Sequence, residues 1–260
     1  MRLSSSSALV LRALLFSVAQ LMNASPVQFQ SGVTQTSFLE LYTSEGCSSC
    51  PPAEAWLSRL KESRRLWKDL VPVAFHVDYW DYLGWKDPFA SKAYTQRQHD
   101  YANRWRSRSV YTPGFALDGE EWTDWPRRDE IPSPSAKPAG VLTARSTDGR
   151  DWTLRFQPTA GSPSLSSYNF FAALLGFDLS SDVKAGENRG HKLKHDFVVL
   201  ALANGAATAS GNATLATITL NPKLKSVPKR LAIAAWVTPA RSLQPVQAVG
   251  GWLSSTNEVR

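Results

Sequence analysis

The segment that decides the fold runs from Phe38 to Leu60 and reads FLELYTSEGCSSCPPAEAWLSRL. Its first six residues, FLELYT, combine aromatic and aliphatic side chains as a short β-strand does. The thiols of Cys47 and Cys50 follow almost at once. Apolar residues then recur at the spacing of an amphipathic helix: Ala53, Trp56, Leu57, Leu60 and Trp67. The segment therefore predicts a strand and a helix, joined by a turn that carries both thiols.

The next elements extend this unit. Val71 to Val77 (VPVAFHV) is a nearly continuous apolar run, which is typical of a strand covered on both faces. Strand, helix and strand with short connections predict a parallel βαβ unit with a right-handed crossover. A second helix is expected after Asp87-Pro88, and Val110 to Trp122 is expected to form a hairpin that turns at Asp118-Gly119.

The two cysteines are the only ones in the chain, and they lie three positions apart. A disulfide that closes so short a loop adds little stability, so the pair indicates chemistry. At the start of a helix Cys47 is the expected nucleophile, because the helix N-terminus stabilises a thiolate, and Cys50 is the expected resolving thiol. Pro51 and Pro52 lack amide hydrogens and predict a delayed or distorted helix start.

A Cys-x-x-Cys pair can also bind a metal ion. A c-type haem site requires a histidine after the second cysteine, where Pro51 stands. A structural zinc site requires four ligands, and no second pair lies at finger-like spacing. A copper ion bound by Cys47, Cys50 and His76 is the remaining alternative, although a lone histidine in an apolar strand is more often a core residue.

Two further stretches contain polar groups of interest. The aromatic segment Tyr79 to Trp85 (YWDYLGW) is expected either to line a recognition cleft beside the thiols or to form an aromatic mini-core. Asp78 or Asp81 is a candidate for proton transfer to the buried thiol. His191 and His195 lie in the basic stretch RGHKLKH, which is expected to be a solvated loop.

The second half of the chain is rich in predicted β-strands. Residues 126–139 are rich in proline and mixed charge and are predicted to be a linker. Seven β-like segments follow and predict a sandwich. They are Val141 to Ser146, Trp152 to Gln157, Tyr168 to Leu179, Phe197 to Ala203, Ala213 to Leu220, Leu231 to Val237 and Val246 to Leu253.

Three motifs, FLELYTSEGCSSCPPAEAWLSRL, FHVDYWDYLGWKDPFAS and SVYTPGFALDG, together resemble the bacterial family of domain of unknown function 1223, a thioredoxin-like group of predicted exported proteins. KAGENRGHKLKHDFVVLALA extends the resemblance more weakly. The resemblance implies an α/β thioredoxin-like domain over residues 36–125, followed by a β-rich, sandwich-like domain over residues 140–255. It places the family's cysteine pair on Cys47 and Cys50 and its cis-proline on Pro113, and it implies no established substrate.

The N-terminus predicts export. The first 24 residues contain two arginines, no acid and the apolar stretch Ala8 to Met22, as a signal peptide does, with cleavage after Ala24. The alternative is an uncleaved membrane anchor, but Arg12 interrupts the apolar run. The expected location is therefore periplasmic or secreted. No later stretch is apolar enough to span a bilayer, so no stable membrane insertion is expected after cleavage.

Charge and motif together limit the partners. Without residues 1–24 the chain has 27 basic and 22 acidic residues, scattered with no long basic run, so no nucleic-acid partner is expected. The sequence predicts a thiol-disulfide oxidoreductase that acts on protein thiols or disulfides, with no cofactor and no resident metal, through Cys47, Cys50 and Pro113. The alternatives are a binding or scaffold protein with a structural cysteine pair, and the copper-handling protein that uses His76.

Overall fold

The computed structural model describes residues 26–127, 131–159, 168–222 and 228–253. The predicted signal peptide and residues 128–130 of the predicted linker lie outside this part of the chain. The elements are β1 (Val27–Gln30), β2 (Ser37–Thr43), α2 (Cys50–Ser58), β3 (Leu70–His76), α3 (Lys92–Trp105), β4 (Gly114–Leu117), β5 (Glu120–Glu121), β6 (Gly140–Ser146), β7 (Asp151–Pro158), β8 (Tyr168–Phe177), β9 (Leu179–Asp182), β10 (Lys192–His195), β11 (Val198–Ala206), β12 (Thr208–Ser210), β13 (Ala213–Thr219), β14 (Arg230–Pro239) and β15 (Gln247–Leu253). Short 3-10 turns occupy Arg59–Glu62, Asp81–Leu83 and Trp125–Arg127.

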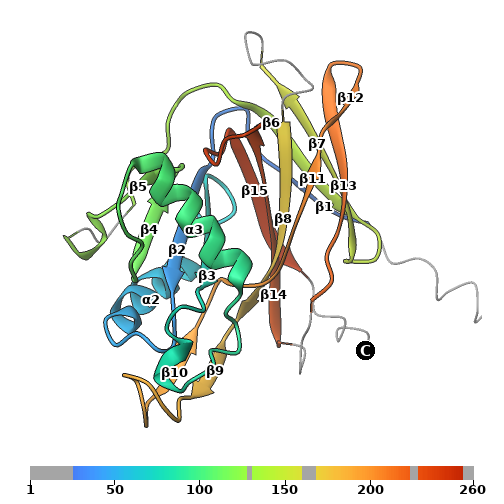
Figure 1. The fold of residues 1–260 in the computed structure, drawn as a ribbon. Coiled ribbons are helices and arrows are strands. Elements are labelled where there is room, and N and C mark those ends of the chain that lie inside the picture. The colour runs from blue at the N-terminus through green and yellow to red at the C-terminus, as the bar shows by residue number, and fades with distance from the viewer. Residues whose placement is uncertain (1–25, 128–130, 160–167, 223–227, 254–260) are drawn as a thin grey trace, which may run out of the picture.

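A single eight-stranded sheet forms the centre of the molecule, in the order β15-β14-β8-β11-β3-β2-β4-β5 (Figure 1). Strands β2 and β3 run parallel, and all their residues are buried. Strand β11 joins β3 in parallel through the pair Val198 and Ala74, and the remaining neighbours are antiparallel. Strands from both halves of the chain therefore share one hydrogen-bonded sheet.

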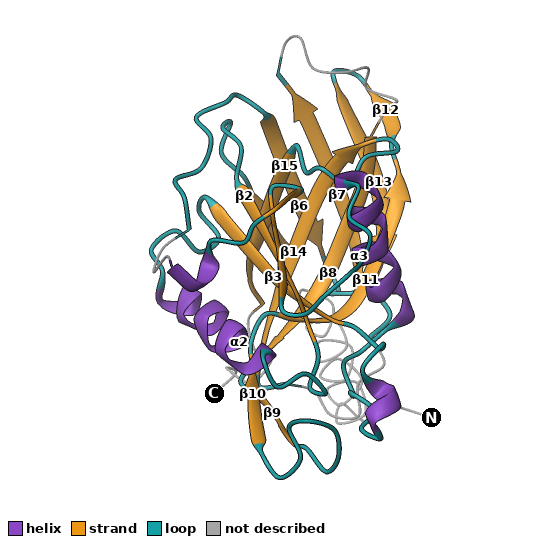
Figure 2. Ribbon diagram, turned by 60° about the vertical axis from the view of Figure 1, so that its left-hand side comes forward, coloured by secondary structure: helices purple, strands orange, loops and turns teal. Residues whose placement is uncertain are grey.

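Two smaller sheets complete the β structure. A five-stranded sheet has the order β1-β6-β7-β13-β12, so the first described strand of the chain pairs with β6. Strands β9 and β10 form a two-stranded hairpin that projects below the central sheet, near the start of α2 (Figures 1 and 2). This hairpin brings a late part of the chain beside the cysteine turn.

Successive residues of β8 and β14 alternate between two hydrophobic cores. The core against the five-stranded sheet contains Phe170, Ala172, Leu174, Ile233, Ala235 and Val237. The core on the opposite face contains Ala173, Leu175, Phe177, Ala232, Ala234 and Trp236. Because side chains alternate between the faces of a strand, both faces of these two strands must be covered, and this explains their uninterrupted apolar sequence.

The predicted fold class is therefore wrong. We expected an α/β thioredoxin-like domain followed by a separate β-rich, sandwich-like domain. Within the described residues there are two α-helices, and large multi-stranded sheets account for most of the regular structure. The apolar strands of the second half do not form a sheet of their own, because β11 hydrogen-bonds to β3 and so extends the sheet that contains β3. The boundaries given for the domains stay predictions.

Most local predictions are confirmed. The strands β2 and β3, the helix α3, the hairpin at Asp118-Gly119 and all seven later β segments are present. Asp118 and Gly119 both have positive φ, 52° and 86°, as the tight hairpin turn requires. The prolines do not delay α2, which begins at Cys50 with proline in its first turn. No helix among the described residues is long and apolar enough to cross a membrane.

One buried ion pair ties the helical layer to the sheet. Arg97 of α3 donates to both carboxylate oxygens of Glu40 in β2, at 2.6 and 3.0 Å. Tyr42 and Tyr101 also donate to this carboxylate. The guanidinium lies 5.4–5.5 Å from the centres of four aromatic rings, and these rings belong to Phe75, Tyr101, Phe171 and Trp236. Arg97 therefore joins elements from both halves of the chain.

Removal of the Glu40 charge should strongly destabilise the fold. Glu40→Gln leaves the Arg97 guanidinium buried without its counter-charge, which costs roughly 3–5 kcal/mol of unfolding free energy. Urea denaturation followed by circular dichroism measures this loss. The exposed pair of Arg104 and Glu120 supplies the control, because Glu120→Gln should change stability by less than about 1 kcal/mol. Equal effects of the two substitutions would contradict the prediction.

Candidate functional site

The cysteine turn lies where β2 ends and α2 begins. Cys47 and Cys50 are both free thiols and both buried, with 1% and 0% of their surface exposed. The Cys50 amide donates to the Cys47 carbonyl at 3.3 Å, which closes the turn. The apolar strand and the helix predicted from the sequence thus bring the two thiols together at one helix N-terminus.

The surroundings of Cys47 favour its thiolate. A hydrogen bond with the Cys50 thiol is the largest influence, and together with contacts to Ser49 and Thr112 it outweighs burial and lowers the pKa of Cys47 to about 6. The Ser49 hydroxyl lies 3.2 Å from the sulfur. For Cys50, burial and the neighbouring Cys47 raise the pKa well above its ordinary value. The two thiols are therefore inequivalent, as the roles of nucleophile and resolving thiol require.

Pro113 lies beside the cysteine turn, as expected. The Thr112-Pro113 peptide bond is cis, and the Thr112 carbonyl lies 3.7 Å from Cys47 Sγ. The indole of Trp80 donates to the Thr112 hydroxyl at 2.8 Å. Trp80 and Tyr79 of the aromatic segment are thus near the thiols, whereas Tyr82 of the same segment is 78% exposed.

The acids proposed for proton transfer have other partners. The Asp78 carboxylate accepts a hydrogen bond from the Thr95 hydroxyl, which itself accepts one from the Asp78 amide, and Asp81 accepts one from the Asp87 amide. Among the described contacts neither acid reaches Cys50. The hydroxyl of Thr43 contacts the Cys50 sulfur and donates to Glu54 Oε1 at 2.6 Å. Thr43 and Thr112 are therefore the polar neighbours of Cys50 besides Cys47. The sequence did not reveal the role of Thr43, because this threonine reads as an ordinary strand residue.

The loop between β9 and β10 covers the cysteine turn. Glu187 accepts hydrogen bonds from the amide and the hydroxyl of Ser48, at 2.9 and 2.8 Å. The side-chain amide of Asn188 donates to the carbonyls of Glu45 and Cys47, at 2.9 and 2.8 Å. A segment about 140 residues further along the chain thus fixes the turn that carries the thiols.

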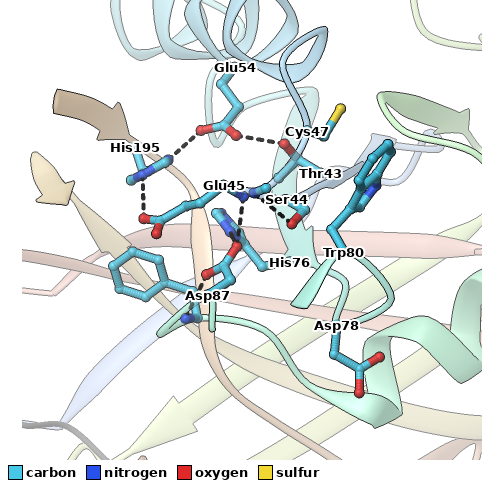
Figure 3. A network of polar contacts seen from close by, with 12 residues as sticks. Thr43, Ser44, Glu45, Cys47, Glu54, His76, Asp78, Trp80, Asp87 and His195 are labelled. Carbon is cyan, nitrogen blue, oxygen red and sulfur yellow. Dashed lines mark hydrogen bonds and ion pairs between the residues drawn. The ribbon is translucent and has the colours of Figure 1, made fainter. Parts of the chain in front are cut away.

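Behind the thiols lies a group that we term the His–carboxylate cluster: Glu45, Glu54, His76, Asp87 and His195, all buried (Figure 3). His76 Nδ1 lies 2.7 Å from Asp87, and His195 Nδ1 is hydrogen-bonded to Glu54. Burial opposes the imidazolium of His195, but Glu54 and Glu45 outweigh it and raise the pKa of His195 to about 10. Burial also opposes the imidazolium of His76, and Asp87 raises the pKa of this histidine.

The expectation that His191 and His195 share a solvated loop is therefore wrong for His195. His191 is exposed, but His195 is 1% exposed at the end of β10. Its partner Glu54 lies 141 residues away in sequence, so no local pattern joins the two. His76 belongs to this cluster as well, and none of the described contacts connects it to either cysteine.

A groove of about 470 Å³ runs beside α2 and opens to solvent. One wall is the helix face of Pro51, Glu54, Ala55 and Ser58, and the other contains Lys61 and residues 192–194 and 196. Lys61 is paired with Asp178 and Asp196. The groove thus reaches from the cysteine turn to the edge of the His–carboxylate cluster.

These features define a β-rich protein with a covered dithiol turn. The chain belongs to the family described as "Protein of unknown function (DUF1223)", whose model matches residues 38–238. Among solved structures it is similar to protein AGR_C_4864 from Agrobacterium tumefaciens, with 23% identity, a TM-score of 0.59, and 88% of this chain and 99% of that chain covered. It is also similar to HBP35 of Porphyromonas gingivalis, with 13% identity, a TM-score of 0.58, and 88% and 80% covered. A search of the curated proteins found no match.

Cys47 should ionise near pH 6, well below an ordinary thiol. The ultraviolet absorbance of the thiolate, followed as a function of pH, measures this without a reagent that must reach the buried sulfur. Cys50→Ala should move the midpoint upward, because the Cys50 thiol makes the largest contribution to the low pKa. Cys47→Ser, the control, should remove the transition. A midpoint at the value of a free cysteine would contradict this prediction.

Loss of the Glu187 carboxylate should expose the cysteine turn. Glu187→Ala removes both hydrogen bonds to Ser48, so the covering loop opens more often and Cys47 is alkylated several-fold faster. Mass spectrometry of iodoacetamide-treated protein gives the rate. Arg189→Ala, at an exposed position of the same loop, is the matched control. Equal alkylation rates in both variants would show that Glu187 does not hold the loop closed.

Proposed function

We propose that this chain is an exported thiol-disulfide oxidoreductase that exchanges disulfides with protein substrates through Cys47 and Cys50. The observation that carries the proposal is the inequality of the two thiols, with the pKa of Cys47 lowered to about 6 and that of the more deeply placed Cys50 raised. A thiol ionised at neutral pH is a ready nucleophile, and its protonated neighbour can then act as the resolving thiol.

The exchange consists of two displacements. The Cys47 thiolate attacks one sulfur of a substrate disulfide, which forms a mixed disulfide and releases the other substrate sulfur as a thiolate that takes up a proton. Cys50 then loses its proton and attacks Cys47 Sγ, which releases the second substrate thiol and leaves the Cys47-Cys50 disulfide. Two electrons pass from the dithiol to the substrate. Oxidation of a substrate dithiol is the same sequence in reverse.

The neighbours of the thiols support this assignment. The Thr112 carbonyl beside Pro113 and the Ser49 hydroxyl border Cys47, where the attacked sulfur must approach. Trp80 holds the Thr112 side chain in place. The copper-handling alternative needs His76 beside the thiols, whereas His76 contacts Asp87 and His195. Disulfide exchange therefore fits the contacts of all three predicted site residues better than copper binding does.

Export is the second part of the proposal. Residues 1–24 have the composition of a signal peptide, and a disulfide-exchanging protein encounters oxidised substrates mainly outside the cytoplasm. N-terminal sequencing of the native protein from the periplasmic fraction or the medium should begin after Ala24. A protein recovered only in the cytoplasm with its first residues intact would refute this part.

The exchange chemistry predicts opposite behaviour of the two cysteine variants. Wild-type protein should reduce the insulin disulfides in the presence of dithiothreitol faster than the reagent alone, and Cys47→Ser should abolish the difference. Cys50→Ser cannot resolve the intermediate, so it should accumulate a mixed disulfide through Cys47. Non-reducing electrophoresis and mass spectrometry detect this adduct. If Cys47→Ser retains the activity, or if Cys50→Ser traps no adduct, the dithiol is structural and the scaffold alternative is favoured.

A further inference from the structure

The His–carboxylate cluster contains three buried polar atoms without a hydrogen-bond partner in the described part of the chain. They are Glu45 Oε1, His76 Nε2 and His195 Nε2. Glu45 Oε1 and His195 Nε2 nevertheless form an ion pair at 2.9 Å (Figure 3), so His76 Nε2 is the one of the three without a polar partner among the described residues. An unpaired buried polar atom is costly, so His76 Nε2 indicates that the cluster lacks a partner.

The donor atoms already converge. One donor atom each from Glu54, His76 and His195 lies within 4.8 Å of the others. The imidazole rings of His76 and His195 are perpendicular within 12°, with their centres 5.2 Å apart. Two imidazoles and a carboxylate are the ligand types that zinc and related divalent ions accept, and Glu45 supplies a second carboxylate beside them.

Three of these four side chains, all but His195, are held from behind by a second polar group. Asp87 engages His76 Nδ1 at 2.7 Å, so Nε2 is left as the free nitrogen. Trp85 donates to Glu45 Oε2 at 2.6 Å and leaves Oε1. Thr43 donates to Glu54 Oε1 and leaves Oε2 toward His195. Metal-bound histidines and carboxylates are commonly fixed by such outer hydrogen bonds.

The charge of the cluster also calls for a cation. Three carboxylates, of Glu45, Glu54 and Asp87, face two imidazoles, so the cluster stays negative even with both rings protonated. No lysine or arginine of the described residues forms an ion pair with these three carboxylates. A divalent ion would supply the missing charge. The groove beside α2 gives it a route, because Glu54 lies in the wall of that groove.

We propose that His76, His195 and Glu54, with Glu45 beside them, bind one divalent transition-metal ion, for which zinc is the test ion. The site has nitrogen and oxygen ligands only and is separate from the thiols. Its ligands come from β3, α2, the cysteine turn and β10, so the ion clamps the β9–β10 hairpin to the helix that carries Cys50. The role is structural, since all four side chains are buried.

Metal analysis of the purified protein tests the site. The mature chain, produced in zinc-supplemented medium with a tag that lacks histidine, should contain about one zinc per chain by mass spectrometry of the metal. His76→Ala and His195→Ala should lose it. The chain has four histidines, so His99→Ala and His191→Ala, both at exposed positions, are matched controls that should retain the metal. Asp87→Asn should weaken zinc binding by about 10- to 100-fold.

Two further experiments cover the cases in which the histidine variants do not fold or the thiols bind the metal. If the histidine variants do not fold, wild-type protein is unfolded with a chelator and refolded, and zinc should then raise its melting temperature while cobalt gives the visible absorption of a four-coordinate site. The double variant Cys47→Ser, Cys50→Ser should keep its zinc, which separates this site from thiolate binding and from the proposed exchange activity.

Three results would overturn the proposal. The first is substoichiometric metal in the wild-type chain together with no effect of zinc on the refolded apoprotein. The second is full retention of metal by folded His76→Ala. The third is loss of the metal in the cysteine double variant, which would place the ion on the thiols instead.

Discussion

The position of Arg97 constrains much of this structure. Its guanidinium is 6% exposed, paired with Glu40 and surrounded by aromatic rings of β3, β8, β14 and its own helix. A buried charge is tolerated only where a counter-charge and hydrogen bonds meet it, so α3 has one acceptable position against the sheet. That position requires β2 and β3 of the first half to lie in the same sheet as β8 and β14 of the second. Any arrangement that separated Glu40 from Arg97 would leave a buried charge unpaired, so the ion pair favours this arrangement of the strands.

The sequence predicted the elements well and their assembly poorly, and the reason is the range of the interactions. Strand β2, helix α2 and strand β3 follow one another with short connections, so local periodicity is sufficient to identify them. No local stretch of the sequence indicates that Val198 pairs with Ala74. A strand buried on both faces reads the same in a sandwich as in the middle of a mixed sheet. The eight-stranded sheet therefore could not be told from two separate domains.

The residues of the site also differ in how well the sequence alone could place them. The proximity of Cys47, Cys50 and Pro113 could be predicted because their residue types and order are themselves the signal. His195 was assigned to a solvated loop because its neighbours Lys192 and Lys194 are charged, and both are indeed exposed. Lys194 and His195 are neighbours in a strand, so their side chains point to opposite sides. The side chain of His195 is buried because α2 packs against the end of β10. Only the three-dimensional packing supplies Glu54 as the partner that makes a buried histidine tolerable.

Helix α2 connects the two sites physically. Its first residue is Cys50, and one turn later Glu54 enters the His–carboxylate cluster, with the Thr43 hydroxyl in contact with both. Any change that reorients Glu54 therefore acts on the Cys50 sulfur through one hydroxyl group. The loop that is hydrogen-bonded to the cysteine turn is continuous with β10, whose last residue is His195. This loop and the helix that bears the resolving thiol are thus anchored to one buried cluster, so their relative position depends on the contacts within that cluster.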